Sequence, residues 1–335
     1  MAPTRRVAAP ENSVTCEAVT KAFGDQRAVD ELTLAVRSGS IYGLIGPSGG
    51  GKTTTVRLMT GVLGPDTGRV TALGRDPATL KARQRARLGY LQQSPALLPE
   101  LSAWENLRFT AATNGVGLRR RRRLFEALEL VELTGDRHKR VDELSGGMRR
   151  RLALAATLVH EPELLFLDEP TAGIDPILRA RFWARFVELR DEGRTLVVTT
   201  QYVGEARFCD RVGLIDQGRL VADGTPAELR RQAFGGEMID LVTTAPLADD
   251  LVERLAKVPQ IEVVRGERID LRTVRLVVDD AGERLPHLMR WLDGEQVGVD
   301  SCEEHVPDFD EVFVTLVKAG HHDEPEQGLA GRSEG

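Results

Sequence analysis

One glycine-rich stretch of this 335-residue chain has the residue types and spacing to bind a phosphate chain. It follows the pattern G-x-x-x-x-G-K-[ST], in which glycines let backbone N–H groups turn toward an anion. The lysine supplies a mobile cation for the β- and γ-phosphates, and the hydroxyl after it suits Mg²⁺. We therefore predict a nucleoside triphosphate site, with the candidate binding residues Gly46, Pro47, Ser48, Gly49, Gly50, Gly51, Lys52, Thr53 and Thr54.

The segments on both sides of this loop supply the context that the pattern requires. Residues 41–45 are an apolar run expected as a buried strand, and residues 54–60 are expected to begin a helix. A helix that starts here adds free N–H groups and the positive end of its dipole to the anion site. The alternative is a glycine-rich turn that happens to precede a lysine, and the flanking strand and helix argue against it.

Two carboxyl groups end another apolar run. Residues 164–167 are all apolar, and Asp168 and Glu169 follow them directly. A carboxylate at the end of a buried strand is costly unless it meets a cation, and Mg²⁺ held jointly with Thr53 is the natural partner of Asp168. Glu169 is then placed to polarise an attacking water as general base. The alternative for Glu169 is a charge at the N-terminus of a following helix.

The order of further motifs along the chain narrows the class of protein. After the phosphate loop come Gln93, the run Leu144-Ser145-Gly146-Gly147-Met148, Asp168-Glu169, and Gly173-Ile174-Asp175. The serine of the Ser-Gly-Gly run stands 23 residues before the aspartate. With this ordered set, the chain resembles the ATP-binding subunit of an ABC transporter over residues 13–232. The resemblance implies that the chain is an ATPase and that ATP and Mg²⁺ are its cofactors.

The resemblance also assigns roles to residues outside the phosphate loop. In that family two ATPase units face each other head to tail and sandwich two ATP molecules. Ser145, Gly146 and Gly147 would then meet the γ-phosphate held by the partner copy, at the start of a helix. Asp175 matches the loop that signals across this dimer interface.

Two further residues match family contacts with an alternative left open. Gln93, after the strand candidate at 88–91, matches a glutamine that touches Mg²⁺ and senses the membrane partner. Gln92 stands where such sequences often have proline, so the register there is ambiguous. Phe23 matches the aromatic residue that stacks on adenine, and a core phenylalanine is the alternative.

Gln201 departs from the family pattern. Most members have histidine here, in contact with the γ-phosphate and the catalytic glutamate. Glutamine can donate an N–H to phosphate but cannot carry a positive charge or shuttle a proton. Either hydrolysis persists with Glu169 as the base and Gln201 positioning phosphate, or the site is slow. The presence of Glu169, Lys52 and Ser145 favours persistent hydrolysis, so Glu169, Gln201 and Lys52 are the expected catalytic residues.

The run Thr199-Thr200-Gln201-Tyr202 and Met148 resemble the exporter subfamily typified by daunorubicin transporters. This resemblance implies a homodimeric ATPase subunit that energises export of drugs, antibiotics or other hydrophobic compounds through a separate transmembrane permease. It further implies a peripheral place at the cytoplasmic face of a bacterial cell membrane. The alternatives are a soluble ABC ATPase that acts on ribosomes or DNA, and an importer subunit.

The composition is that of an ordinary globular protein. The chain is 41% hydrophobic and 29% charged, with a formal net charge of −6, so no broad affinity for nucleic acid is expected. Three widely spaced cysteines fit a reducing compartment, with the thiols as core filler. No signal peptide is visible, and no apolar run approaches the roughly 18 residues of a membrane span. The arginine run 119–123 is either a solvated helix face or a contact with anionic headgroups.

The order of the expected elements predicts a mostly parallel α/β sheet, the core of a P-loop NTPase, over residues 13–232. A helical subdomain is inserted at about 98–160, with helices expected at 103–112, 118–133 and 146–159. A small α+β accessory domain is expected at 237–319, and residues 1–12 and 320–335 are expected to be a flexible and a disordered tail. Within the accessory domain we expect strands at 238–242, 261–264 and 274–278, and helices at 247–258, 285–292 and around 309–317.

Overall fold

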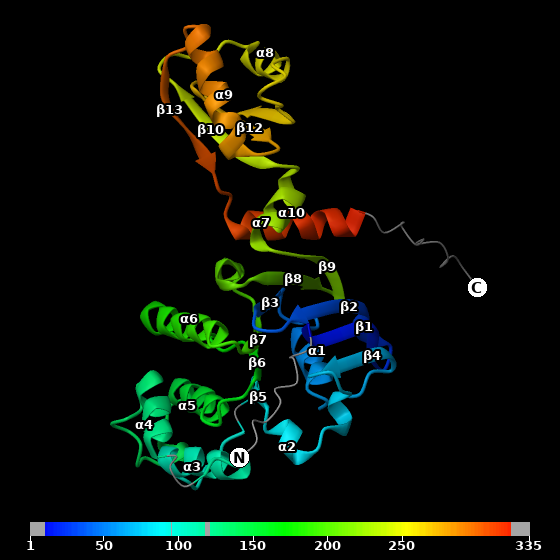
Figure 1. Ribbon diagram of the computed structural model, residues 1–335, viewed down its shortest axis with the longest axis vertical. Coiled ribbons are helices and arrows are strands. Elements are labelled where there is room, and N and C mark those ends of the chain that lie inside the picture. The colour runs from blue at the N-terminus through cyan, green and yellow to red at the C-terminus, as the bar shows by residue number, and fades with distance from the viewer. Residues whose placement is uncertain (1–10, 95, 118–120, 323–335) are drawn as a thin grey trace, which may run out of the picture. The chain divides into compact units, whose positions relative to one another are not determined.

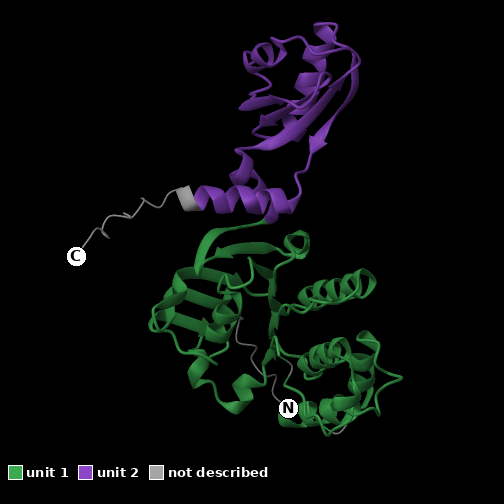
Figure 2. Ribbon diagram, turned by 180° about the vertical axis from the view of Figure 1, so that it is seen from behind, with its two compact units in different colours: residues 1–225 green, residues 226–335 purple. Residues whose placement is uncertain are grey.

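The computed structural model describes residues 11–94, 96–117 and 121–322, and it divides the chain into two compact units. Unit 1 ends at Thr225 and unit 2 begins at Pro226 (Figures 1 and 2). Each unit has its own sheets and its own core. The parts of the predicted tails at residues 1–10 and 323–335 lie outside the described residues.

Unit 1 contains nine strands and several helices among the described residues. The strands are β1 (Asn12–Phe23), β2 (Gln26–Arg37), β3 (Ile41–Ile45), β4 (Thr67–Ala72), β5 (Leu88–Leu91), β6 (Leu164–Asp168), β7 (Thr195–Thr200), β8 (Arg211–Asp216) and β9 (Arg219–Gly224). The α-helices are α1 (Lys52–Met59), α2 (Ala82–Arg85), α3 (Ala103–Thr113), α4 (Arg121–Leu130), α5 (Gly146–Leu158) and α6 (Pro176–Asp191). Short 3-10 turns are η1 (Pro77–Thr79), η3 (Val141–Glu143) and η4 (Val203–Phe208).

The larger sheet of unit 1 has the strand order β5-β6-β7-β3-β8-β9. Its neighbours pair in parallel, except β8 with β9, and the α/β core predicted from the sequence is therefore confirmed. The smaller sheet is antiparallel, with the order β2-β1-β4. In the larger sheet Ile45 pairs with Thr200, and Asp168 pairs with Thr199. The carboxyl ends of β3, β6 and β7 therefore meet at one edge, which is where open α/β sheets bind ligands.

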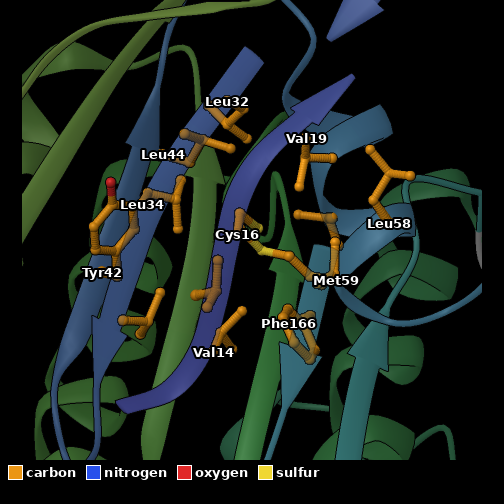
Figure 3. Close-up of a cluster of buried hydrophobic side chains, with 14 of the residues drawn as sticks. Val14, Cys16, Val19, Leu32, Leu34, Tyr42, Leu44, Leu58, Met59 and Phe166 are labelled. Carbon is orange, nitrogen blue, oxygen red and sulfur yellow. The ribbon is translucent and has the colours of Figure 1, made fainter. Parts of the chain in front are cut away.

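One apolar core joins the two sheets of unit 1 to α1 (Figure 3). It contains Cys16 of β1, Leu44 of β3, Met59 of α1 and Phe166 of β6, all at most 1% exposed. Full burial of such a leucine, methionine or phenylalanine side chain contributes about 1.5–3 kcal/mol. Cys16 is core filler, as expected, and burial raises the pKa of its thiol to about 12. This packing fixes α1 against β6, the strand that ends in the two carboxylates.

Helices α3, α4 and α5 lie between β5 and β6 in the chain, where the sequence predicts an inserted helical subdomain. The helix predicted at 118–133 is α4, which ends at Leu130, because the chain turns there and Glu132 adopts a φ of 56°. Residues 118–120 lie outside the described residues. Each described arginine of the run 119–123 has a partner on the protein: Arg121 on the ring of Phe125, Arg122 on Glu126 and Arg123 on Glu161.

Unit 2 has one four-stranded sheet, and the small α+β fold predicted for this region is confirmed. Its strands pair antiparallel in the order β11-β12-β10-β13. Its buried core includes residues of α8 and α9. Its elements are α7 (Pro226–Phe234), β10 (Glu237–Thr243), α8 (Leu251–Ala256), β11 (Arg265–Arg268), β12 (Thr273–Val278), α9 (Ala281–Gly294), β13 (Val299–His305) and α10 (Phe309–His322).

Two elements predicted in unit 2 are wrong in their bounds. Residues 247–258 were expected as one helix, but only Leu251–Ala256 are helical. Residues 261–264 were expected as a strand, but Ile261 follows a turn and Glu262 has a φ of 50°, which interrupts an extended run. Ile261 is nevertheless fully buried in the core. Ile261 is therefore apolar because it is a core residue, not because it belongs to a strand. The edge strand β11 begins four residues later.

Helix α7 belongs to unit 2, so the two units divide a few residues before the boundary expected from the sequence. It packs on α10: the Arg230 guanidinium lies 5.7 Å from the centre of the Phe309 ring, and Arg230 Nε donates to the Pro307 carbonyl at 3.4 Å. Helix α10 extends to His322, so residues 320–322 are helical where a tail was expected, and Asn12 begins β1. Among the described helices, none is long and apolar enough to cross a membrane.

Candidate active site

The phosphate loop spans residues 46–51 between β3 and α1. Gly51 caps α1 with a φ of 102°, a conformation that favours glycine, and a side chain there would meet the Ala28 carbonyl at 2.5 Å. Helix α1 therefore begins at Lys52, two residues before the predicted start. The loop is braced from within by a hydrogen bond from the Gly50 N–H to the Pro47 carbonyl at 3.1 Å. The first turn of α1 therefore follows the loop directly, with no residue between them.

Lys52 lies beneath this loop with its side chain only 4% exposed. Its ammonium donates to the carbonyls of Gly46 and Pro47, both at 2.8 Å, and lies 3.9 Å from Glu169 Oε1. Burial lowers the pKa of Lys52, while the nearby Glu169 and Asp168 carboxylates oppose this shift. The ammonium is therefore a desolvated cation between the loop and the end of β6. It is suited to an anion that arrives at the loop.

Asp168 is fully buried at the end of β6. Its Oδ1 accepts hydrogen bonds from the hydroxyls of Thr199 at 2.6 Å and Thr53 at 3.2 Å. Its Oδ2 is buried and has no hydrogen-bond partner among the described residues. A buried carboxylate oxygen without a partner is costly, and a cation bound through oxygen ligands would satisfy it. Thr53 and Asp168 together fit a hard cation such as Mg²⁺.

This pair would need further ligands from outside the protein. Within the part of the chain that the structure describes, no group of three or more His, Cys, Asp or Glu side chains could hold a metal ion by itself. Mg²⁺ commonly binds through one or two protein oxygens together with the phosphates of a substrate and water. The arrangement therefore suits a cation that arrives with a nucleotide.

Glu169 has a strained backbone conformation, and hydrogen bonds to the neighbouring strand β7 hold it in place. Its φ is 50°, which is uncommon for a residue with a side chain. Its N–H is directed at Thr199, with 2.9 Å to the hydroxyl and 3.1 Å to the carbonyl oxygen. Helix α6 begins only at Pro176, so Glu169 does not lie in its first turn and that alternative role is wrong. The geometry turns its carboxylate toward Lys52.

Thr199 and Arg150 are two functional residues whose roles the sequence did not reveal. Thr199 contacts both members of the carboxylate pair, because β7 lies next to β6. Arg150, on α5, donates from Nη2 to the carbonyls of Asp168, at 3.4 Å, and Glu169. Only the strand order and the packing of α5 bring these side chains to the site. The repeated threonines at the end of an apolar strand were the sole available signal.

Replacement of Thr199 by valine is expected to destabilise unit 1 by about 1–3 kcal/mol, since a buried carboxylate oxygen and an N–H lose a partner. Urea unfolding of the full chain, followed by tryptophan fluorescence, measures the loss. Thr113→Val is the matched control, because that exposed hydroxyl donates to the carbonyls of Phe109 and Thr110 in its own helix. A loss no larger than that of the control would contradict the role of Thr199.

The Ser-Gly-Gly motif and Gln93 lie in one exposed region of unit 1. Ser145 caps α5 by accepting the Met148 N–H at 3.2 Å, and Gly146 and Gly147 are exposed after it. Gln93 and Gly146 line the same cavity of about 500 Å³. Among the described residues, no hydrogen bond or ion pair joins this group to Lys52 or the carboxylates. The free N–H groups of this helix start are open to another molecule.

The remaining predicted residues are also placed at the surface. The Asp175 carboxylate caps α6 through the N–H groups of Ile177 and Leu178, at 3.1 and 3.0 Å. Phe23 is 53% exposed, so the core alternative for it is wrong, and the Lys21 ammonium lies 5.8 Å from its ring centre. Gln201 is exposed and directly follows β7, at the edge where the carboxylates end.

Known proteins share both the sequence and the fold of this chain. Residues 29–172 match the family described as ABC transporter. The daunorubicin resistance ATP-binding protein DrrA2 of Streptomyces coeruleorubidus is 39% identical over 319 residues, which cover 93% of this chain and 96% of that protein. The probable multidrug ABC transporter ATP-binding protein YbhF of Escherichia coli is 40% identical over 231 residues, which cover 69% of this chain and 40% of that protein.

Solved structures of similar shape correspond to unit 1 in extent. The structure of an ATP-binding subunit of an ABC transporter matches with a TM-score of 0.62 and 28% identity, over 66% of this chain and 93% of that one. A dimeric, post-hydrolysis structure of an ATP-binding cassette bound to ADP and Pi matches with a TM-score of 0.59 and 26% identity, over 63% and 98%.

Proposed function

Because this chain belongs to the family of ABC transporter ATP-binding proteins, we propose that it hydrolyses ATP to drive export through a separate membrane permease. One observation carries the hydrolytic part of the proposal. Lys52, Asp168 and Glu169 meet at the edge of the sheet where β3 and β6 end, directly beside the phosphate loop. A lysine for the phosphates, an aspartate that can hold Mg²⁺ and a carboxylate that can orient the attacking water are recurring parts of phosphoryl-transfer sites.

Each of these residues has a distinct task in the proposed reaction. The N–H groups of Ser48, Gly49 and Gly51 and the Lys52 ammonium would hold the β- and γ-phosphates. The N–H groups at the start of α1, including those of Thr53 and Thr54, would add to this site. Thr53, Asp168 and Gln93 would hold Mg²⁺, which supplies charge neutralisation on the phosphates when bound. Glu169 accepts a proton from the attacking water, and its N–H bond to Thr199 keeps it in place.

The exposed motifs complete the site through a second copy of the chain. Ser145 and the N–H groups of Gly146 and Gly147 reach no phosphate loop within their own chain, yet they begin a 13-residue helix. In a head-to-tail homodimer they would bind the γ-phosphate on the partner's loop, with Asp175 at the shared interface. Phe23, exposed at the end of β1, would stack on adenine. ATP then favours the closed dimer, because only in that state does each ATP contact the phosphate loop of one copy and the Ser-Gly-Gly motif of the other.

Export of drugs, antibiotics or other hydrophobic compounds is the transport direction that we propose. DrrA2, a daunorubicin resistance protein, matches 93% of this chain, including unit 2. A daunorubicin resistance protein, DrrA3, of the same organism is 43% identical over 234 residues, and the Nod factor export protein of Paraburkholderia xenovorans is 38% identical over 242. The chain would act at the cytoplasmic face of the membrane through its permease, with α3 to α5 as the inserted helical subdomain.

Phosphate release by the purified full chain tests the hydrolytic proposal. We expect release with ATP and Mg²⁺ that stops when EDTA removes the metal. The alternative, a soluble ATPase acting on ribosomes or DNA, predicts strong stimulation by those particles. Absence of release, or release seen only with ribosomes or DNA, would contradict the proposal.

Replacement of Gln201 by histidine is expected to leave the rate of ATP hydrolysis equal or to raise it a few fold. Histidine can reach the same phosphate and can also carry a positive charge. Steady-state phosphate release at saturating ATP measures the change, and Gln84→His on the exposed helix α2 is the control. A large loss of rate in Gln201→His alone would show that the site is built around glutamine.

A further inference from the structure

A buried polar network connects η4, α6 and the segment that follows Glu169. It has no role in the proposed reaction as described so far. At its centre is Glu205 of η4, whose side chain is only 4% exposed. Its Oε1 accepts a hydrogen bond from the hydroxyl of Thr171 at 2.8 Å, and Thr171 is itself fully buried. Thr171 follows Glu169 by two residues. The network therefore joins η4 to the segment that carries the proposed general base.

Arg179 of α6 is the second member of the network and contacts three segments. Its Nη2 donates to the Ile174 carbonyl at 3.3 Å, one residue before Asp175. The centre of its guanidinium lies 4.4 Å from the centre of the Tyr202 ring, close enough for a cation–π contact. Its Nε lies 4.0 Å from Glu205 Oε1. One side chain thus bridges the residue after Gln201, the segment before Asp175 and the buried glutamate.

Two atoms of this network lack hydrogen bonds although they are buried. Arg179 Nε and Glu205 Oε2 have no hydrogen-bond partner among the described residues. The guanidinium therefore keeps an unused donor, and the carboxylate an unused acceptor, in a buried environment of low dielectric. A closer approach of the two groups would be favourable there, because it would satisfy both atoms. The distance of 4.0 Å between Arg179 Nε and Glu205 Oε1 depends on how α6 packs against η4. The contact therefore links the position of η4 to that of the segment 169–175.

We propose that Arg179 and Glu205 are positioning residues that hold Gln201 in register with Glu169 and Asp175. The side chain of Gln201 makes no hydrogen bond to the described residues, but the ring of the adjacent Tyr202 packs against the Arg179 guanidinium. The hydroxyl of Thr171 and the carbonyl of Ile174 tie the same pair to the other side of the site. This inference rests on the proposed ATPase activity, because the pair acts only by placing groups that contact ATP.

Steady-state ATP hydrolysis by variants of the full chain tests the inference. We expect Arg179→Ala and Tyr202→Ala each to lower kcat about tenfold while KM for ATP changes less than about twofold, since a misplaced reacting group slows the chemical step. Tyr202→Phe keeps the ring and should recover most of the kcat lost in Tyr202→Ala. Glu205→Gln keeps an acceptor for Thr171 but loses the charge, so its kcat should lie between wild type and Arg179→Ala.

The matched control is Arg185→Ala, which removes another arginine of α6 whose ion-pair partners among the described residues are Glu188 and Glu192, both exposed. Its kcat should equal that of wild type. Unchanged kcat in both Arg179→Ala and Tyr202→Ala would overturn the inference, as would a kcat of Tyr202→Phe no higher than that of Tyr202→Ala. A wild-type chain that releases no phosphate would instead overturn the proposed function, so the two failures are distinct.

Discussion

Replacement of Glu169 by glutamine is expected to lower the rate of ATP hydrolysis about a thousandfold and to leave the affinity for ATP nearly unchanged. Removal of a general base costs about 10²–10⁴-fold in rate. Glutamine has the same shape and keeps the N–H bonds to Thr199, because these involve the backbone of residue 169. Phosphate release measures the rate, and binding of a fluorescent ATP analogue measures the affinity.

Glu163→Gln is the matched control for this variant. Glu163 directly precedes β6, at the opposite end from Glu169, and its exposed carboxylate pairs with Arg87 at 2.6 Å. It should hydrolyse ATP like the wild type. A Glu169→Gln chain that turns over normally would remove Glu169 from the mechanism.

Replacement of Lys52 by alanine is expected to weaken ATP binding about 10–100-fold and to abolish measurable hydrolysis. A hydrogen bond to a charged group contributes about 1.5–3 kcal/mol, and each 1.4 kcal/mol is a factor of ten in affinity. The ammonium also donates to two loop carbonyls, so its loss leaves the loop less ordered. Titration of the same fluorescent ATP analogue gives the affinity.

Lys139→Ala serves as the control for this second variant, because Lys139 pairs with Asp136 at the surface of unit 1. Its affinity should match that of the wild type. If Lys52→Ala bound ATP as tightly as this control, the buried ammonium could not be the phosphate contact that we propose.

Much of the fold of unit 1 could be predicted from the sequence, since its signals are local. Strand β5 has the bounds of the strand candidate at 88–91, and β6 begins with the uninterrupted apolar run at 164–167. The phosphate loop is equally local, because glycine spacing and the lysine after it are adjacent in the chain. These features depend on neighbours in sequence, which a pattern can report.

The rest depended on neighbours in space. The strand order β6-β7-β3 places Thr199 beside Asp168, and no periodicity of the chain encodes that order. The contact of Arg150 with the carbonyl of Glu169 likewise requires the packing of α5. In unit 2, Ile261 looked like a strand residue because it is apolar, but a turn buries it. Long-range packing therefore determined the positions of these residues, which the local sequence patterns left ambiguous.

The roles that we propose for Ser145 and Asp175 depend on a second copy of the chain, whereas we propose no role in the reaction for unit 2. The two side chains cap α5 and α6 within one chain, which any serine or aspartate at those positions could do. Their proposed contacts across a dimer explain why these helix starts remain exposed. The capping contacts alone would not distinguish the two roles.

The most direct test of the central claim is to identify the protein that this chain binds in a membrane. The full chain is tagged in its native host, the membranes are solubilised gently, and the stoichiometric partner is identified by mass spectrometry. We predict recovery of a multi-span membrane protein together with MgATP hydrolysis by the complex. Recovery from the soluble fraction, in stoichiometric association with ribosomes or nucleic acid, would contradict the claim that this ATPase energises a permease.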